Sequence, residues 1–165
     1  MDLNMQLDPK ALRHALGRYA TGVTVITCRN AQGERLGLTA NSFNSLSLDP
    51  PLVLWALRTA STHLADFQQA THFAVNVLGQ DQLGLSQRFA SPVPDRFAEG
   101  AWHDGHGGAP VLAGAVAVFE CATTQQLNAG DHVLFIGQVL NFAQDATVAP
   151  LLYQGGAYRR LGPAL

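Results

Sequence analysis

Short runs of β-branched and other apolar residues alternate with turn residues along most of the chain, which predicts a protein built mainly of strands. The predicted strands are residues 23–28, a strand leading into Gly37, 42–48, 52–57, 73–78, 115–127, 132–143 and a pair within 151–161. Turn-forming segments such as 30–33 and 128–131 separate neighbouring strands, and no regular alternation of strand and helix is visible. The pattern favours a closed or nearly closed antiparallel β-barrel with a few peripheral helices.

Helical spacing is limited to the N-terminal region and two short internal segments. Asp8 and Pro9 are suited to begin a helix, because aspartate can cap a free N–H group and proline has none to leave unpaired. An apolar stripe then follows at helical spacing, made of Ala11, Leu12, Ala15, Leu16 and Tyr19. Ser61 is predicted to cap a short helix that ends at about Ala70, and residues 80–90 are a second helical candidate.

Length and composition indicate one folded domain over residues 1–165, because 47% of the 165 residues are hydrophobic. Residues 1–7 are predicted to be a loose tail, and they lack the charged and apolar regions of a secretory signal. The longest apolar run, 50–57, is far shorter than the ~20 residues of a membrane helix. We therefore expect a soluble, cytoplasmic protein without a membrane partner. The Gly- and Pro-rich segment 91–110 predicts a long ordered loop, a feature that is often functional.

The charge balance argues against a polyanionic partner. The sequence contains ten Lys and Arg residues and 12 Asp and Glu residues, and Lys10 is the only lysine. No basic run or stripe occurs, so binding to nucleic acid or to a membrane surface is not expected.

The motifs of several common chemistries are absent. The sequence has no GxGxxG, no GxxxxGK[ST] and no GxSxG, which argues against a Rossmann site, a P-loop and a serine-hydrolase elbow. His103 and His106 lie among glycines without a third ligand nearby, so no metal site is predicted. Cys28 and Cys121 lie in apolar runs without CxxC spacing, which favours buried reduced thiols over a disulfide. A bound cofactor is therefore expected to carry the chemistry.

The segment 37–48 is unusually polar for its position between strongly apolar strands. It gathers small residues, hydroxyl groups and the amides of Asn41 and Asn44. Such a segment could let the backbone approach a flat ligand with a polar edge, whose donors and acceptors the side chains would satisfy. It could equally be a polar edge strand that faces solvent. Composition alone supports both interpretations equally.

Motifs spread over nearly the whole chain occur in the order and at the spacing of one known family. They are 16–27, 37–48, 49–53, 73–78, Arg88-Phe89, the loop from Phe97 to Trp102, Glu120-Cys121 and 130–137. Together these segments resemble the short-chain flavin reductase family, the reductase components of two-component flavin-dependent monooxygenases. The resemblance implies an FMN-binding split β-barrel of Greek-key type, mainly β with peripheral helices.

The resemblance assigns flavin-binding roles to residues in three parts of the chain. The family segment that lines the flavin ring matches Thr39, Ala40, Asn41 and Ser42, with Asn41 in place of the usual serine or alanine. The segment around the ribityl chain and phosphate matches Ala56, Leu57, Arg58, Ser61, Thr62 and His63. Arg88 and Phe89 match an RF pair whose arginine supports the phosphate region. A helix that begins near Ser61 would also direct N–H groups at a phosphate. The alternative for Arg58 and Arg88 is a solvated charge or a surface ion pair.

His132 is the residue for which the resemblance implies a catalytic role. It follows Gly130-Asp131 and matches the family's GDH motif, whose histidine lies on the nicotinamide side of the flavin. Without the resemblance, a histidine that opens an apolar strand is more often a structural group. We expect His132 to orient the nicotinamide rather than to carry a proton. Looser matches to a segment that helps bind NADH or NADPH are Tyr153, Tyr158 and Arg159.

The implied activity is hydride transfer from NADH or NADPH to FMN or FAD, a reaction carried by the cofactors themselves. The resemblance also implies a homodimer with each flavin site near the subunit interface, and transient transfer of reduced flavin to a separate monooxygenase. Two alternatives stay open: a non-catalytic flavin-binding carrier or sensor, and an enzyme of the pyridoxamine-phosphate-oxidase type. The sequence decides neither FMN against FAD nor NADH against NADPH, since Arg159 and Arg160 could contact a 2′-phosphate or lie in solvent.

Overall fold

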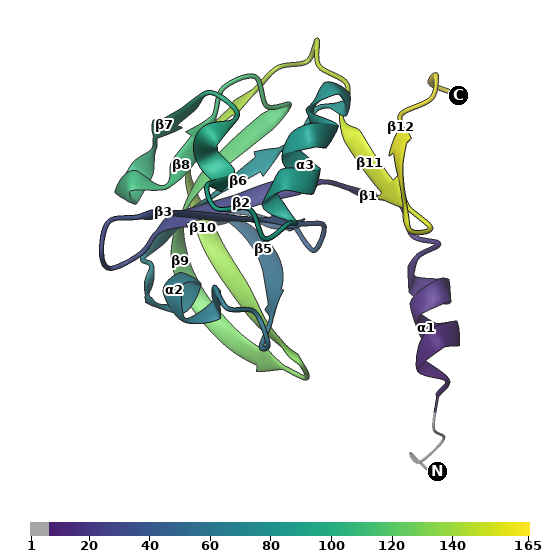
Figure 1. The fold of residues 1–165 in the computed structure, drawn as a ribbon, viewed down its shortest axis with the longest axis horizontal. Coiled ribbons are helices and arrows are strands. Elements are labelled where there is room, and N and C mark those ends of the chain that lie inside the picture. Colours follow the sequence, from purple (N-terminus) through teal and green to yellow (C-terminus); the bar gives the residue numbers. More distant parts are fainter. Residues whose placement is uncertain (1–6) are drawn as a thin grey trace.

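The computed structural model describes residues 7–165, and the body of the molecule is one seven-stranded sheet (Figure 1). In spatial order its strands are β3 (Arg35–Ala40), β2 (Thr24–Arg29), β6 (His72–Val77), β9 (Ala117–Ala129), β10 (His132–Gln144), β5 (Pro51–Arg58) and β4 (Asn44–Leu48). All neighbouring strands in this order are antiparallel. The mainly β, split-barrel fold predicted from the sequence is confirmed, with β3 and β4 as the edge strands of the sheet.

Two smaller sheets and several short helices complete the fold. One sheet joins β1 (Thr21–Gly22), β11 (Leu151–Gln154) and β12 (Ala157–Arg160), and the other pairs β7 (Trp102–Asp104) with β8 (Pro110–Leu112). The helices are α1 (Pro9–Leu16), α2 (Leu64–Gln69) and α3 (Leu83–Phe89), with 3₁₀ turns η1 (Gln80–Gln82), η2 (Arg96–Ala98) and η3 (His106–Gly108). The prediction of a long loop over 91–110 is therefore wrong in part, because two 3₁₀ turns and the β7–β8 hairpin lie in this segment.

The core lies on both faces of the sheet. On one face Trp55 stacks on Phe135 with ring centroids 4.7 Å apart, and Phe67 from α2 packs edge-on against Trp55. On the other face a second buried cluster gathers around Phe89 of α3. Because both faces are covered, residues 24–28 of β2 are all buried, which explains their nearly continuous apolar run.

Both cysteines lie in the core as free thiols. Burial raises the pKa of Cys28 and of Cys121 to about 12, so neither thiol ionises near neutral pH. The expectation of buried reduced cysteines is confirmed.

A buried polar pair connects the β7–β8 hairpin to the sheet. Asn76 on β6 is fully buried, donates to the Val25 carbonyl at 3.1 Å and accepts from the Leu112 backbone N–H at 2.8 Å. Thr27 on β2 donates to the Pro110 carbonyl at 2.5 Å. These bonds satisfy backbone groups at the hairpin that would otherwise be buried without a partner.

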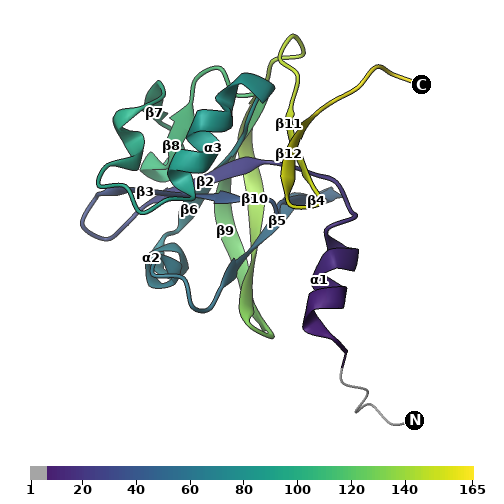
Figure 2. The same ribbon diagram turned by 45° about the vertical axis from the view of Figure 1, so that its right-hand side comes forward.

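The N-terminal helix projects away from the body, below the β11–β12 hairpin (Figures 1 and 2). Asp8 caps it as predicted, since its carboxylate accepts from the Lys10 N–H at 3.0 Å. No residue of α1 is buried, and Leu12, Leu16 and Tyr19 are 45%, 67% and 76% exposed. We call residues 8–22 together with β11 and β12 the arm. A Gly155 N–H···O=C Gly17 bond of 2.8 Å joins its two parts.

Within residues 7–165, no helix combines the length and apolar character needed to cross a membrane. The tail predicted over residues 1–7 lies outside the described residues, apart from Leu7. The single-domain boundary at 1–165 stays a prediction.

Candidate functional site

A cavity of about 690 Å³ lies beside edge strand β3, between it and the end of β5. The turn before α2, the C-terminal end of α3 and the first residue of η2 complete its wall. The lining residues are Leu38, Thr39, Leu57, Arg58, Ala60, Ser61, Thr62, His63, Phe89, Ala90 and Arg96. Segments far apart in the sequence therefore meet at one opening, and seven of the residues predicted for flavin binding contribute to it.

Two hydroxyl groups, one near the end of β3 and one just after it, bind backbone groups of neighbouring elements. Ser42 Oγ donates to the Ala56 carbonyl at 2.9 Å and accepts from the Ala56 N–H at 3.0 Å, which bridges the segment to β5. Thr39 Oγ1 donates to the Ser86 carbonyl at 2.6 Å and so ties β3 to α3. Ala40 packs against the core. The two hydroxyls thus fix the wall, and their predicted contact with a ligand ring stays a prediction.

At Gly37 the packing of neighbouring aromatic rings leaves no room for a side chain. A Cβ atom there would lie 2.8 Å from Phe89 Cε1 and 3.2 Å from Phe97 Cζ, closer than atoms normally approach. Phe89 and Phe97 meet edge to face, with ring centroids 5.0 Å apart. The glycine therefore lets the aromatic wall of the cavity pack directly on β3.

Arg96 brings a positive charge to the cavity that sequence reasoning missed. Its guanidinium donates to the Gly37 carbonyl at 2.7 Å and to the Ser91 carbonyl at 3.1 and 3.2 Å. In the described part of the chain, the ion pairs formed by arginine involve Arg29, Arg35 and Arg88, and no carboxylate pairs with Arg96. Burial lowers the pKa of Arg96, yet a guanidinium stays charged at neutral pH. A partly dehydrated cation without a counter-charge is suited to bind an anion.

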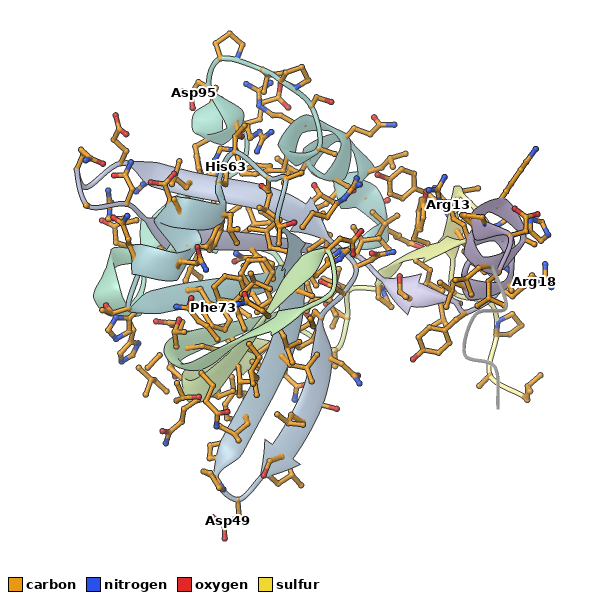
Figure 3. The ribbon with its side chains drawn as sticks, turned by 90° about the horizontal axis from the view of Figure 1, so that it is seen from below. Arg13, Arg18, Asp49, His63, Phe73 and Asp95 are labelled. Atoms are coloured by element: carbon orange, nitrogen blue, oxygen red, sulfur yellow. The ribbon has the colours of Figure 1, made fainter. Side chains whose placement is uncertain are left out.

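His63 lies beside this cation. Its Nε2 is 3.3 Å from Arg96 Nη1, so Nε2 accepts and the ring carries its proton on Nδ1. Burial, followed by the charge of Arg96, lowers the pKa of His63 below its ordinary value, which keeps the ring neutral at pH 7. Figure 3 shows His63 on the same side of the molecule as Asp95, the residue before Arg96.

The helix predicted to begin at Ser61 begins three residues later. Helix α2 covers Leu64–Gln69, and His63 is its N-cap. Ser61 Oγ accepts from the His63 N–H at 3.3 Å, so Ser61 shapes the preceding turn instead. Helix α2 has only six residues, which gives too small a dipole for the phosphate attraction predicted at Ser61.

Arg88 does not reach the cavity. Its guanidinium donates to the backbone carbonyls of Asp95 and Arg96, the latter at 3.0 Å, and pairs with Glu99 at 3.5 Å. Arg88 therefore fixes the segment that carries Arg96. The signal for Arg96 was present in the sequence, because Arg96-Phe97 repeats the Arg88-Phe89 pair eight residues later.

The residues predicted for the nicotinamide cofactor lie in two places. Tyr153 and Tyr158 line a cavity of about 200 Å³ with Val23, Thr39 and Asn41. Tyr158 is also 2.8 Å from Ser86 Oγ through its hydroxyl, and Arg159 is exposed on β12. Since Thr39 lines this cavity and the larger one, the two tyrosines lie close to the larger opening.

His132 begins β10 directly opposite Arg58 on β5. Its ring hydrogen-bonds through Nδ1 to the Asp131 carboxylate at 2.7 Å, and its side chain is 39% exposed. This hydrogen bond, with the charge of His132 second, lowers the pKa of Asp131. His132 does not line the cavity, although its cross-strand neighbour Arg58 does.

No group of three or more metal-ligating side chains occurs among the residues that the structure describes.

The profile of the family "Flavin reductase like domain" matches residues 16–162. The chain belongs to this flavin reductase-like family. The match covers every strand described above and the whole wall of the cavity.

Curated relatives and solved structures extend the similarity of this flavin reductase-like chain. It is 46% identical over 151 residues to a "Probable flavin reductase" of Rhizobium meliloti, covering 92% of the chain and 48% of the relative. It is 44% identical over 149 residues to the reductase component of a flavin-dependent trigonelline monooxygenase of Acinetobacter baylyi, covering 90% and 48%. The chain thus spans about half the length of these two relatives. The structure of Streptomyces globisporus NADH:FAD oxidoreductase SgcE6 with NAD and FAD fragments gives a TM-score of 0.89 at 38% identity, covering 95% of this chain and 96% of that one.

Proposed function

We propose that this protein is an NAD(P)H-dependent flavin reductase, with Thr39, Leu57, Arg58, Ser61–His63, Phe89 and Arg96 as the flavin site. The observation that carries the proposal is the Arg96 guanidinium, which pairs with no carboxylate among the described residues, in a cavity lined by both apolar and polar side chains. An anionic group attached to a flat, largely apolar ring system is the ligand that such a site fits. Flavin nucleotides have this construction.

The residues fit such a ligand along its length. Arg96 would hold the phosphate, with the hydroxyl groups of Ser61 and Thr62 as further donors. Leu57 and Phe89 offer apolar contact toward the ring. Of the predicted ring segment, Thr39 lines this cavity and Asn41 lines the smaller cavity that shares Thr39, whereas Ala40 and Ser42 line neither. The flavin would supply the hydride-accepting chemistry, so the protein needs no nucleophile of its own. The role left to the protein would be to hold the nicotinamide and flavin rings so that their reacting atoms lie roughly 3–3.5 Å apart.

The activity itself is tested by mixing the purified protein with NADH or NADPH and with riboflavin, FMN or FAD. Oxidation of the nicotinamide, followed by absorbance at 340 nm, is the expected result. If no combination is turned over, the enzyme assignment fails. Retention of a yellow chromophore without turnover would support the non-catalytic flavin-binding alternative.

We further propose that His132 orients the nicotinamide, together with Tyr153, Tyr158 and Arg159. His132→Ala is expected to lower kcat/KM for NADH about 3- to 10-fold, the size of one lost hydrogen bond. Flavin affinity is expected to stay within about twofold, because His132 does not line the flavin cavity. Steady-state kinetics and flavin fluorescence titration measure the two quantities. His103→Ala, at an exposed histidine of β7, is the control, and an unchanged kcat/KM in His132→Ala removes the assignment.

The product would be reduced flavin that passes to a separate monooxygenase. The name of the Acinetobacter baylyi relative, a reductase component, supports this role. The position of the cavity beside an edge strand suits a flavin that enters and leaves.

The arm supports the proposal of a homodimer. Its basic residues are Lys10, Arg13, Arg18, Arg159 and Arg160, and its only acidic residue is Asp8. The body carries the five other arginines and all other acidic residues of the described chain, so it is net negative. A basic arm with an exposed apolar stripe is complementary to the acidic body of a second copy. Figure 3 shows Arg13 and Arg18 on the arm, well apart from His63.

Leu12→Glu/Leu16→Glu is expected to convert this dimer to a monomer. Burial of a leucine side chain contributes roughly 1.5–3 kcal/mol, so losing two should raise the dissociation constant at least about 100-fold. Sedimentation velocity at micromolar concentration measures the change. Leu127→Glu, which alters an exposed leucine of β9 away from the arm, should stay dimeric. A wild-type monomer that reduces flavin at full rate would contradict the proposal.

A further inference from the structure

The β11–β12 hairpin of the arm meets the body beside α3 (Figure 1). A backbone bond runs there from the Leu151 N–H to the Leu78 carbonyl at 2.9 Å. Among the residues that the structure describes, one side-chain hydrogen bond joins the arm to the body, between the Tyr158 hydroxyl and Ser86 Oγ at 2.8 Å. The orientation of Tyr158 relative to the body therefore depends on this bond.

Ser86 uses its hydroxyl on the arm and not on its own helix. A serine in a helix commonly donates to the carbonyl four residues before it. Ser91 follows this pattern just after α3, since its hydroxyl donates to the Gln87 carbonyl at 2.6 Å. Ser86 is fully buried within α3, and its hydroxyl bonds Tyr158, a residue 72 positions further along the chain.

The backbone of Ser86 binds the wall of the flavin cavity. Its carbonyl accepts from Thr39 Oγ1 at 2.6 Å, and Thr39 lines both the flavin cavity and the smaller cavity of about 200 Å³. Tyr158 lines only the smaller one. Ser86 lines neither cavity, yet it binds Thr39 through its carbonyl and Tyr158 through its hydroxyl. One buried residue therefore fixes the position of Tyr158 relative to the flavin cavity.

The smaller cavity is suited to one flat ring. Its volume lies below the range of about 300–1,000 Å³ that drug-sized ligands occupy, so it has no room for a whole dinucleotide. The rings of Tyr153 and Tyr158 meet edge to face in its wall, with centroids 5.3 Å apart, and Asn41 adds an amide group. A flat ring that carries a carboxamide, as nicotinamide does, matches an aromatic wall with an amide partner.

The fold does not need the Ser86–Tyr158 bond for stability. Tyr158 already packs against the buried cluster around Phe89. Replacing both partners of a buried hydrogen bond by apolar groups of similar shape is often nearly neutral for stability. A hydrogen bond differs from apolar packing in its direction, because it weakens steeply when donor and acceptor are misaligned. The bond therefore adds a fixed orientation of the Tyr158 ring.

We propose that Ser86 is a positioning residue for the nicotinamide ring, acting through Tyr158. Its hydroxyl holds the tyrosine wall of the smaller cavity in place relative to Thr39, which keeps the nicotinamide ring at reacting distance from the flavin. The inference rests on the proposed function and adds to it a residue that contacts neither cofactor. Loss of the bond leaves both cofactors bound but lowers the fraction of time that the reacting atoms are aligned.

The experiment compares Ser86→Ala, Tyr158→Phe and the double variant by stopped-flow reduction of FMN with NADH. Each single variant is expected to lower the single-turnover rate about 3- to 10-fold, the size of one lost hydrogen bond. The KM for NADH and the affinity for FMN should change less than about twofold. The double variant should lose no more than either single variant, because both changes remove the same bond. It also leaves neither hydroxyl without its partner, so it tests the proposal even if a single variant folds poorly.

Tyr19→Phe is the control, since it removes the hydroxyl of a tyrosine of the arm that is 76% exposed, and the rate should be unchanged. Rates within about twofold of wild type in both single variants overturn the inference. Losses that multiply in the double variant show two independent effects and also overturn it. A matching loss of FMN affinity or of thermal stability assigns the bond a structural role only. Each of these results leaves the proposed function standing, whereas a wild type that reduces no flavin removes the proposed function itself.

Discussion

Arg96→Ala is expected to weaken FMN binding about 10- to 100-fold while riboflavin binding changes less than about twofold. The reason is that Arg96 supplies a positive charge that no carboxylate of the described residues compensates, and hydrogen bonds to charged groups contribute about 1.5–3 kcal/mol. Riboflavin lacks the phosphate, so removal of the Arg96 side chain takes no hydrogen bond or ion pair from bound riboflavin. Fluorescence titration with the two ligands measures the difference directly.

Two further variants separate binding from structure. Arg96 also donates to the Gly37 and Ser91 carbonyls, so its loss could loosen the whole wall. Arg96→Lys keeps the charge and should recover part of the FMN affinity. Arg160→Ala removes one exposed positive charge elsewhere and should have no effect. If Arg96→Ala weakens riboflavin as much as FMN, the residue holds the loop and does not bind phosphate.

Asn76→Leu is expected to lower the free energy of unfolding by about 2–4 kcal/mol. The side chain is fully buried, and its removal leaves the Leu112 N–H and the Val25 carbonyl without these partners. Unsatisfied buried groups cost about 1–3 kcal/mol each, whereas the similar volume of leucine limits any cavity. Urea denaturation measures the change, and the β7–β8 hairpin should become more sensitive to protease.

The matched control is Asn128→Leu, at an exposed asparagine near the end of β9, which should change stability by less than about 0.5 kcal/mol. A loss below about 1 kcal/mol in Asn76→Leu would show that water or a shifted backbone replaces these bonds.

The local pattern of the sequence determined most of the fold. Alternation and β-branched runs located the strands, because side chains on successive strand residues face opposite sides of the sheet and β-branched residues suit an extended backbone. The Asp8-Pro9 pair located the first helix for an equally local reason, the capping of free N–H groups. The family was indicated by motifs spread along the chain, each of which can be recognised without knowing which residues surround it in the folded protein.

Tertiary structure decided which of the two Arg-Phe pairs brings a cation to the cavity. Arg88-Phe89 and Arg96-Phe97 are alike in sequence, and only the folded chain shows that Arg88 binds the backbone of the second pair. Arg96 is then left facing the cavity without a carboxylate. Pairing between distant charges depends on which loops meet, and sequence spacing does not encode that.

The contacts of the polar segment 37–48 also depend on the tertiary structure. Its hydroxyls at Thr39 and Ser42 bond to backbone groups of α3 and β5, and Gly37 makes room for Phe89 and Phe97. The sequence determined that this stretch is polar, small and placed between apolar strands. The tertiary structure divided it: residues 37–39 lie at the cavity, whereas residues 44–48 form the mostly exposed edge strand β4. The partners that bind the hydroxyls of Thr39 and Ser42 come from segments 47 and 14 residues away, which the local sequence does not show.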